Sequence, residues 1–415
     1  EQERAYKEKF IGFAGMMQPD ESFFTGAERL KPAQEIKKEF NLKKMPEKAV
    51  LYATAHGVYK AYINGNAVSD TRLAPETTRY DKLLYYQTYD ITALIKEGEN
   101  VLNVTVADGW WIGRVGLAGD SCNYGDMLGF LGQLEFTYAD GHKEIIASDK
   151  SFVSRESYIR YSDLYIGEKR DETFVFGPWI PCKETEYDNS VLMAQPADPI
   201  RVIDEVNVKE YICTPEGDLV LDFGQVLTGV LNIEFTGKKG SEISLEHAEV
   251  LDINGNFKNN IIGRCKDQKD IIICGDNTES FCPEFTYHGF RYVRVKGLNK
   301  DRIKSAKALV IGTPVKKLAS FSTDNDDINR LQSCIEWSTV TNMTGVPTDC
   351  PQREKLGWTG DIRVFGDTGC FLYDLRNILG NWLYQMRLDQ YADGQIPVVI
   401  PNHPSQEMLQ MEMSG

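Results

Sequence analysis

The chain has 415 residues, enough for roughly two to four domains that each bury a core of their own. Its 61 acidic residues against 46 basic ones give a formal net charge of −15, and this excess disfavours nucleic acid and anionic membrane surfaces as partners. No window of about 18 apolar residues predicts a transmembrane helix, so a membrane-spanning protein is disfavoured as well.

The cysteine and histidine content predicts neither a disulfide framework nor a metal site. The nine cysteines are scattered, odd in number and form no C-x-x-C pair. The five histidines lie far apart in the sequence, so no histidine-based metal site and no cofactor are predicted. Reduced thiols favour the cytoplasm. Residues 1–4 contain neither a methionine nor an apolar signal region, however, so a removed signal or an internal start leaves the periplasm and secretion open.

The first part of the chain has the pattern of short β-strands. Residues 1–40 form an irregular lead, and residues 50–63 then alternate up to Asn64-Gly65, which predicts a tight hairpin. The same period recurs in three further segments, residues 86–91, 101–106 and 133–138. Strands at this spacing predict an antiparallel β-sandwich. Trp110 and Trp111 are candidates for a sugar platform, but neighbours on a strand point to opposite faces, so core packing of at least one is favoured.

A second strand-rich block follows residues 181–200, which are polar, contain three prolines and are predicted to be a linker. Its predicted strands are residues 219–223, 229–235, 243–251 and 285–293. His247 and Glu249 are two apart on one predicted strand and share a face, which suits a ligand pair. A polar cluster at a domain junction is the favoured alternative.

From residue 316 onward the apolar period becomes helical, with Thr323 and Asp324 offering capping oxygens before the first predicted helix. Three helices are predicted, each with one face buried, and their apolar positions are Ile328, Leu331 and Ile335; Ile362, Phe365 and Leu372; Ile378, Trp382 and Met386.

The segment between the first two predicted helices, residues 346–361, carries the candidate chemistry. Its prolines and glycines oppose a continuous helix and predict a shaped loop. The functional candidates on it are three carboxylates, one arginine and one tryptophan: Asp349, Glu354, Asp361, Arg353 and Trp358. This set suits sugar chemistry, because one carboxyl can protonate a leaving oxygen, others can hold hydroxyls and an indole can pack on a pyranose. The alternative is a solvated loop in which Arg353 and Lys355 pair with the acids.

This loop resembles the signature of the bacterial α-L-rhamnosidases of glycoside hydrolase family 78, D-C-P-Q-R-(x)-E-x-L-G-W-T-G-D. Here it reads Asp349-Cys350-Pro351-Gln352-Arg353-Glu354-Lys355-Leu356-Gly357-Trp358-Thr359-Gly360-Asp361, without the optional residue before the glutamate. Further segments similar to the family are residues 62–65, 86–91, 97–101, 108–114, 162–168, 247–249 and 287–292. The resemblance covers most of the chain from residue 50 onward.

The resemblance implies a multidomain, mainly β fold of two antiparallel β-sandwiches followed by the first helices of an (α/α)6 toroid. The implied domains are residues 1–180, 181–315 and 316–415, the last being an incomplete toroid. The implied activity is hydrolysis of terminal α-L-rhamnosyl residues from glycosides or polysaccharides with inversion. In that reaction Glu354 is the general acid, Asp349, Arg353 and Asp361 bind sugar hydroxyls, and Trp358 shapes the pocket.

The family's general base lies on a later helix, beyond Gly415, so the 415-residue chain alone is expected to have little or no turnover and to leave apolar helix faces exposed or covered by a partner. The amino-terminal sandwich of some relatives binds rhamnose, sometimes through calcium, but no loop of alternating acids is visible here. Cys350 lies among acids and is expected to be structural. The alternatives are a non-catalytic carbohydrate-binding or assembly protein and a glycosidase for another deoxy sugar, and homo-oligomerisation is left open.

Overall fold

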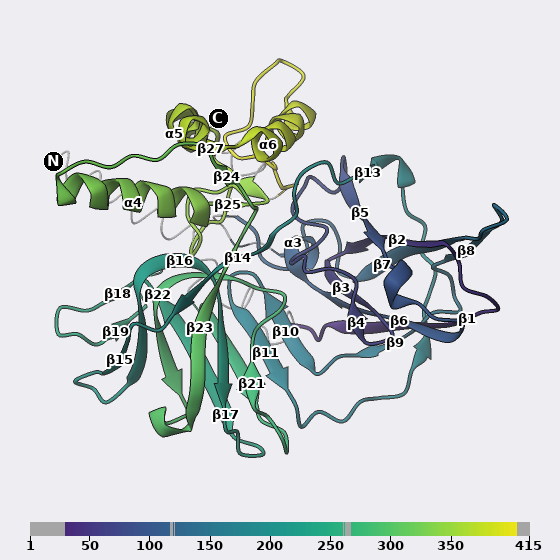
Figure 1. Ribbon diagram of the computed structural model, residues 1–415, viewed down its shortest axis with the longest axis horizontal. Helices are drawn as coiled ribbons and strands as arrows, with labels where there is room; N and C mark the ends of the chain where they lie inside the picture. The colour runs from purple at the N-terminus through teal and green to yellow at the C-terminus, as the bar shows by residue number, and fades with distance from the viewer. Residues whose placement is uncertain (1–29, 117–118, 120, 260, 262–266, 405–415) are drawn as a thin grey trace.

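The computed structural model describes residues 30–404 apart from 117–118, 120, 260 and 262–266, so the predictions for residues 1–29 and 405–415 lie outside the described residues. Most of the regular structure is β, and three longer helices follow it, which confirms the mainly β class (Figure 1). None of the helices in the described ranges is both long and apolar enough to cross a membrane.

Two sheets make up the first β region. The six-stranded sheet has the order β12-β9-β1-β6-β3-β4, and the five-stranded sheet has the order β13-β5-β2-β7-β8. Their strands are β1 Gln34–Leu42, β2 Lys48–His56, β3 Val58–Ile63, β4 Asn66–Ala67, β5 Leu84–Asp90, β6 Gly98–Ala107, β7 Gly129–Thr137, β8 Lys143–Ala147, β9 Val153–Glu156, β12 Ile180–Pro181 and β13 Leu192–Ala194.

Alternating apolar residues of both sheets meet in one buried cluster. Leu51 and Phe136 come from the five-stranded sheet, and Ile63 and Val104 come from the six-stranded sheet. The predicted hairpin at Asn64-Gly65 is confirmed between β3 and β4, where both residues have positive φ, 52° and 83°. The period-two pattern therefore sets which face of each strand is buried.

One ten-stranded sheet makes up the second β region. Eight strands follow the order β10-β11-β20-β17-β22-β16-β23-β14, and two more pair with β16. The strands are β10 Ile159–Asp163, β11 Gly167–Asp171, β14 Arg201–Asn207, β15 Glu210–Cys213, β16 Leu219–Phe235, β17 Glu242–Ala248, β20 Lys269–Ile273, β21 Ser280–Phe281, β22 His288–Lys296 and β23 Ile303–Gly312.

Two strand pairings join segments from opposite sides of residue 180, the predicted end of the first domain. β10 and β11 precede this residue in the sequence, yet β11 pairs with β20 of the ten-stranded sheet. In the expected linker, residues 181–200, β13 lies along β5 of the first region. The two β regions are thus joined by exchanged strands.

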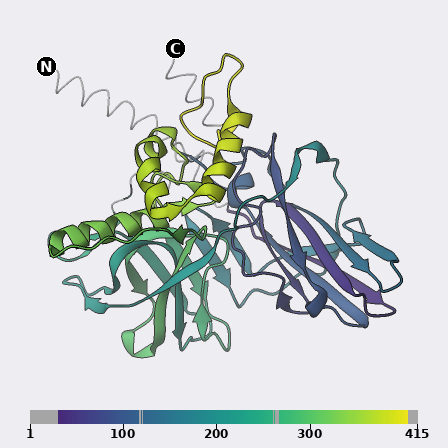
Figure 2. The same cartoon turned by 45° about the horizontal axis from the view of Figure 1, so that its top comes forward.

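The remaining elements are short pieces and the three helices. The short pieces are α3 Gly109–Ile112, the 3-10 turns Thr92–Leu94, Asn189–Val191 and Lys300–Arg302, and the strands β18 Val250–Leu251, β19 Phe257–Lys258, β24 Lys316–Lys317, β25 Met343–Thr344, β26 Val346–Pro347 and β27 Tyr373–Asp374. The helices are α4 Asp326–Thr341, α5 Thr359–Leu372 and α6 Arg376–Asp389. Figures 1 and 2 show them grouped on one side of the β regions, with α4 crossing one end of the ten-stranded sheet.

All three predicted helices are confirmed, but the expected cap of α4 is wrong. Asn325 is the N-cap, and its side-chain oxygen accepts from the backbone N–H groups of Asp327 and Ile328 at 3.0 and 3.2 Å. The hydroxyl of Thr323 instead accepts from the N–H of Asn325 at 3.0 Å. Thr323 therefore braces the cap residue, and the cap lies one residue after Asp324.

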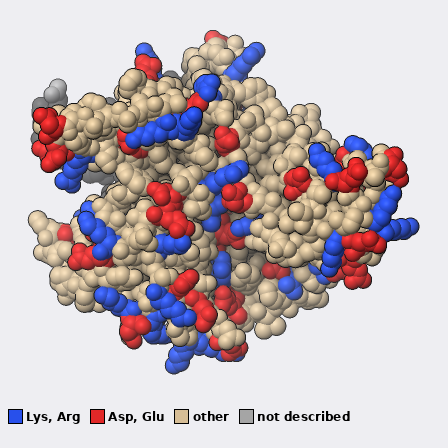
Figure 3. Space-filling view, viewed as in Figure 1, with Lys and Arg blue, Asp and Glu red and all other residues tan. Residues whose placement is uncertain are grey.

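Several apolar side chains of these helices are exposed. Ile328 and Leu331, which were expected on a buried face of α4, are 44% and 61% exposed. The exposed apolar side chains of the other two helices are Val364, Phe371, Leu383 and Tyr384. The described part of the chain does not cover these faces, which agrees with the expectation of exposed apolar helix faces. Figure 3 shows positively and negatively charged side chains interspersed on the face of the molecule that it displays.

The buried carboxyl of Glu76 yields a stability prediction. Its Oε1 accepts from Gln195 Nε2 at 2.8 Å and from the backbone N–H of Ile200 at 2.9 Å, and burial raises its pKa from 4.5 to about 7. Because the folded-state pKa exceeds the unfolded value, the folded state binds more protons between these pH values, and stability falls as the pH rises from about 4.5 to about 7.

Glu76→Gln keeps the accepting oxygen and removes the titrating group. We expect it to raise the free energy of unfolding by about 1–3 kcal/mol at pH 8 and to leave it nearly unchanged at pH 4. Urea unfolding at the two pH values measures this difference. An equal gain at both values, or a loss at pH 8, would contradict the assignment.

Candidate active site

The signature segment follows a small hairpin at the end of α4. β25 and β26 pair with each other, and Gly345 turns between them at a φ of 74°. Residues 348–358 then form a loop without a regular helix, and α5 begins at Thr359. The loop predicted over residues 346–361 is thus confirmed for 348–358, whereas Val346–Pro347 form β26 and residues 359–361 belong to α5.

Glu354 is held by two other signature residues. The indole Nε1 of Trp358 donates to Glu354 Oε2 at 3.0 Å, and Arg353 Nη2 lies 2.9 Å from Glu354 Oε1. The Glu354 side chain is only 14% exposed, whereas that of Arg353 is 55% exposed. Each carboxylate oxygen therefore has a fixed donor, which sets the orientation of the group.

Asp349 lies in the same loop and accepts from its backbone. Its Oδ1 accepts from the N–H of Leu356 at 3.0 Å, and its Oδ2 accepts from the Cys350 thiol at 2.7 Å. Burial raises the pKa of Asp349 to about 6, and the charge of Glu354 adds to that rise. A carboxyl whose pKa lies this close to neutrality is typical of sites with acid–base chemistry.

Cys350 is neutral in this setting. Burial, followed by the charge of Asp349, raises the pKa of its thiol to about 12. Its sulfur also accepts from the N–H of Glu354 at 3.3 Å. These contacts agree with the expected structural role, since a thiol rather than a thiolate is a poor nucleophile.

Asp361 stands apart from this group. It is exposed in the first turn of α5, and no hydrogen bond or ion pair between described residues joins it to Glu354 or Asp349. The structure thus brings together Asp349, Arg353, Glu354 and Trp358 and leaves Asp361 on the helix that follows.

Trp110 and Trp111 lie in the core. They belong to the short helix α3, so the strand expected there is wrong, and their exposures are only 3% and 9%. Gly109, with a φ of 52°, turns the chain into α3. The indole of Trp111 stacks on His56 at 3.7 Å between ring centroids, and Tyr124 lies 5.7 Å away. Core packing, the favoured alternative, accounts for both side chains.

His247 and Glu249 separate at the end of β17. Glu249 Oε2 accepts from Gln352 Nε2 at 3.1 Å and so touches the signature loop. His247 is fully buried and faces Asp270 and His288 instead. The two residues thus belong to polar contacts at a junction, as the favoured alternative predicts, and do not form a ligand pair.

Among the residues that the structure describes, His247, Asp270 and His288 form the group that could hold a metal ion. All three are fully buried, and one ligand atom of each lies within 4.8 Å of the others. His288 Nε2 lies 3.0 and 3.1 Å from the Asp270 oxygens, and His247 Nε2 lies 3.9 Å from Oδ2.

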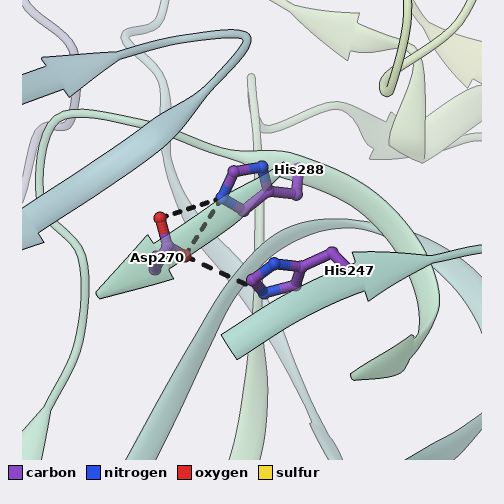
Figure 4. A group of neighbouring side chains, drawn as sticks. All are labelled: His247, Asp270 and His288. Atoms are coloured by element: carbon purple, nitrogen blue, oxygen red, sulfur yellow. Dashed lines mark hydrogen bonds and ion pairs between the residues drawn. The ribbon is translucent and has the colours of Figure 1, made fainter. Parts of the chain in front are cut away.

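Hydrogen bonds and ring stacking hold this cluster together. The imidazoles are stacked with 4.2 Å between centroids and 24° between planes, so they approach the same carboxylate side by side (Figure 4). Burial lowers the pKa of His247 to about 3 and that of His288 well below its usual value, so both rings are neutral.

Two surface hollows lie away from the signature loop. One of about 330 Å³ is lined by Asp198, Asp374 and Asn377 among others, and one of about 530 Å³ lies between β14 and α4 beside Trp337. Neither is lined by a signature residue.

Three family models match the chain in succession. They describe an alpha-L-rhamnosidase N-terminal domain over residues 44–204, a bacterial alpha-L-rhamnosidase concanavalin-like domain over 212–312 and a bacterial alpha-L-rhamnosidase 6 hairpin glycosidase domain over 316–412. The chain belongs to the bacterial α-L-rhamnosidase family. The signature loop falls in the third match.

Relatives of this α-L-rhamnosidase family chain agree with the assignment. An alpha-L-rhamnosidase of Streptomyces avermitilis is 36% identical over 89% of the chain and 37% of its own length. One of Formosa agariphila is 33% identical over 89% of the chain and 42% of its own length. The chain thus spans less than half the length of these curated relatives.

Solved α-L-rhamnosidases share the fold. The enzyme from Aspergillus terreus aligns with a TM-score of 0.86 and 36% identity over 91% of this chain and 45% of its own. The Streptomyces avermitilis enzyme, solved in complex with L-rhamnose, aligns with a TM-score of 0.84 and 35% identity over 90% of this chain and 37% of its own.

Sequence reasoning missed the contacts that reach the signature loop from the β regions. Tyr165 donates to the backbone carbonyl of Glu354, and the Lys355 ammonium donates to the carbonyl of Tyr287 at 2.6 Å. The signal was present, because residues 162–168 and 287–292 resemble the family. No local pattern indicates which loop such residues touch.

Proposed function

We propose that this chain is the amino-terminal part of an inverting α-L-rhamnosidase that hydrolyses terminal α-L-rhamnosyl residues from glycosides or polysaccharides. The observation that carries the proposal is the position of Glu354, whose carboxylate oxygens are held by Arg353 and Trp358 within the family signature. The relative solved with L-rhamnose supports a rhamnose-containing glycoside as substrate.

In the proposed reaction Glu354 is the general acid. Its carboxyl protonates the glycosidic oxygen as the bond to the sugar breaks, and a second carboxylate, roughly 6.5–9.5 Å away, activates water on the opposite face of the ring. We assign no described residue as that base and place it in the remainder that the longer relatives possess. This chemistry uses carboxyl groups and water and needs no cofactor.

The other signature residues bind the sugar. Arg353 presents an exposed guanidinium, and Asp349 presents a carboxylate within the loop, so both suit sugar hydroxyls. We assign the same role to Asp361, in the first turn of α5. Trp358 keeps its indole N–H on Glu354 and offers the rest of the ring as a wall of the pocket.

We propose three domains, residues 1–180, 181–315 and 316–415. The shared apolar cluster between the six- and five-stranded sheets supports a β-sandwich in the first. The apolar cluster of the ten-stranded sheet supports a second, to which β10 and β11 of the first segment contribute two strands. We take α4, α5 and α6 as the first helices of an (α/α)6 toroid, which the match to a 6 hairpin glycosidase domain supports. The exposed apolar residues of these helices would then pack against later helices.

Rhamnose release by the full-length protein tests this function. We expect the purified protein to hydrolyse nitrophenyl α-L-rhamnoside and to yield β-L-rhamnose as the first product, which proton NMR of the fresh product distinguishes from the α anomer. Binding of rhamnose without hydrolysis would contradict the proposal and favour a carbohydrate-binding protein. Hydrolysis confined to another deoxy sugar would contradict the substrate assignment.

The 415-residue chain alone is expected to release no rhamnose, because it supplies the acid without an assigned base. It is also expected to bind a dye that reports exposed apolar surface, since six large apolar side chains of α4, α5 and α6 are exposed. Steady-state assays and dye fluorescence measure both properties, with the full-length protein as the comparison. Turnover by the isolated chain would contradict this prediction.

A further inference from the structure

Lys355 follows Glu354 in the signature and is buried. It is 5% exposed and has a φ of 53°, a conformation that residues other than glycine rarely adopt. Its ammonium donates to the backbone carbonyls of Leu164 and Tyr287 and lies 3.9 Å from the centre of the Tyr287 ring. A buried ammonium is stable only where hydrogen-bond acceptors replace its lost hydration. These contacts therefore fix the position of the Lys355 side chain.

Tyr165 contacts the peptide group between Glu354 and Lys355. Its hydroxyl donates to the carbonyl oxygen of Glu354 and accepts from the N–H of Gly116 at 3.1 Å. The Lys355 ammonium also lies 5.4 Å from the Tyr165 ring. The peptide that links Glu354 to Lys355 is thus fixed from the β10–β11 turn, while the carboxylate of Glu354 remains directed to Arg353 and Trp358.

The start of β22 supports the loop from beneath. A Cβ atom on Gly289 would lie 2.7 Å from Pro351 Cγ and 2.9 Å from the backbone nitrogen of Gln352, so the loop rests directly on this backbone. The neighbouring His288 is tied to Asp270, and the Lys355 charge lowers the pKa of that carboxyl against the larger effect of burial. The buried histidine–aspartate network therefore braces the segment that receives Lys355.

We propose that Lys355 and Tyr165 are positioning residues for Glu354 and fix the peptide carrying the general acid against the ten-stranded sheet. The catalytic part of this inference rests on the proposed rhamnosidase function. A general acid must lie within hydrogen-bond reach of the leaving oxygen, and a misplacement of about 1 Å can lower the rate about 100-fold. The ten-stranded sheet would then contribute to catalysis without touching the substrate.

The first test uses the 415-residue chain and needs no activity. The N–H groups of Lys355 and Leu356 donate within the loop, to Cys350 O at 3.2 Å and Asp349 Oδ1 at 3.0 Å. We expect Lys355→Met and Tyr165→Phe to speed deuterium uptake of these amides at least about 10-fold, because the loop loses its anchors. The matched controls Lys304→Met and Tyr211→Phe are expected to leave it unchanged. Unchanged uptake in both test variants would overturn the proposal.

The second test uses the full-length protein. We expect Lys355→Met to lower kcat about 10- to 100-fold with KM within about threefold, and Tyr165→Phe to act in the same direction to a smaller extent. In a Glu354→Gln background the same changes are expected to cause no further loss, since a positioning residue acts through the group that it positions. A full additional loss in that background would show a general structural role and overturn the proposal.

The outcomes separate the two claims. Absence of rhamnose release by the wild-type protein would contradict the proposed function, and the exchange measurement would still decide whether the anchors hold the loop. If Lys355→Met does not fold, Tyr165→Phe carries both tests, because it removes one hydroxyl and keeps the ring. Normal kinetics of folded Tyr165→Phe with unchanged exchange would overturn the proposal.

Discussion

Glu354→Gln in the full-length protein is expected to lower kcat/KM for methyl α-L-rhamnoside by about 10²- to 10⁴-fold, the usual contribution of a general acid. Glutamine keeps an oxygen for the indole N–H of Trp358, so the side chain retains its place. It cannot supply a proton to the leaving methoxide, and that deficiency causes the loss. Initial rates of rhamnose release, measured with a coupled assay, give the ratio.

A matched control is available on α4. Glu336 pairs with Lys317 at 2.7 Å, away from the signature loop, and Glu336→Gln is expected to leave kcat/KM within about twofold. The melting temperatures of both variants should match that of the wild type. A folded Glu354→Gln protein with more than a third of wild-type activity on this substrate would remove Glu354 from the acid role.

Asp349→Asn is expected to lower kcat/KM by about 10- to 100-fold at pH 7.5, because hydrogen bonds from hydroxyls to a charged acceptor are worth about 1.5–3 kcal/mol. The wild-type carboxyl has a pKa of about 6, raised by burial and by the Glu354 charge. Below that pH it is protonated and loses its negative charge. Wild-type kcat/KM should therefore fall as the pH drops through about 6, and this limb should vanish in the variant.

Cys350→Ala is the control for this prediction, since it removes the thiol that donates to Asp349 Oδ2 and leaves the carboxylate in place. We expect it to keep kcat/KM within about threefold, because the bond from the N–H of Leu356 remains. Profiles of kcat/KM against pH for the three proteins make the comparison. An acid limb near pH 6 that persists in Asp349→Asn would contradict the assignment of that limb to Asp349.

The local parts of the structure were predictable from the sequence. Prolines and glycines defined the loop before α5, apolar spacing predicted α4, α5 and α6, and Asn64-Gly65 predicted the hairpin. These features depend on propensities within a few residues, which a single sequence contains. The grouping of Arg353, Glu354 and Trp358 was predictable for the same reason, since all three lie within six residues of one another.

The parts that depend on distant residues were not predictable in this way. The sequence suggested a partner for Lys355 only in the alternative of a solvated loop, where it pairs with nearby acids, whereas its acceptors lie 191 and 68 residues earlier in the chain. The strand pattern likewise predicts strands without naming their partners, so β11 was grouped with the first β region although it pairs with β20. Trp110 and Trp111 follow a glycine turn into α3, and burial overrode the apparent alternation there.

The central claim, that Glu354 donates the proton to the leaving group, is tested most directly by comparing two leaving groups in Glu354→Gln. Dinitrophenolate departs with little need of protonation, whereas methoxide requires it. We predict that the variant hydrolyses dinitrophenyl α-L-rhamnoside within about 10-fold of the wild-type rate and loses about 10²- to 10⁴-fold on the methyl glycoside. Equal losses on both substrates would show that Glu354 serves another purpose, and would contradict the account.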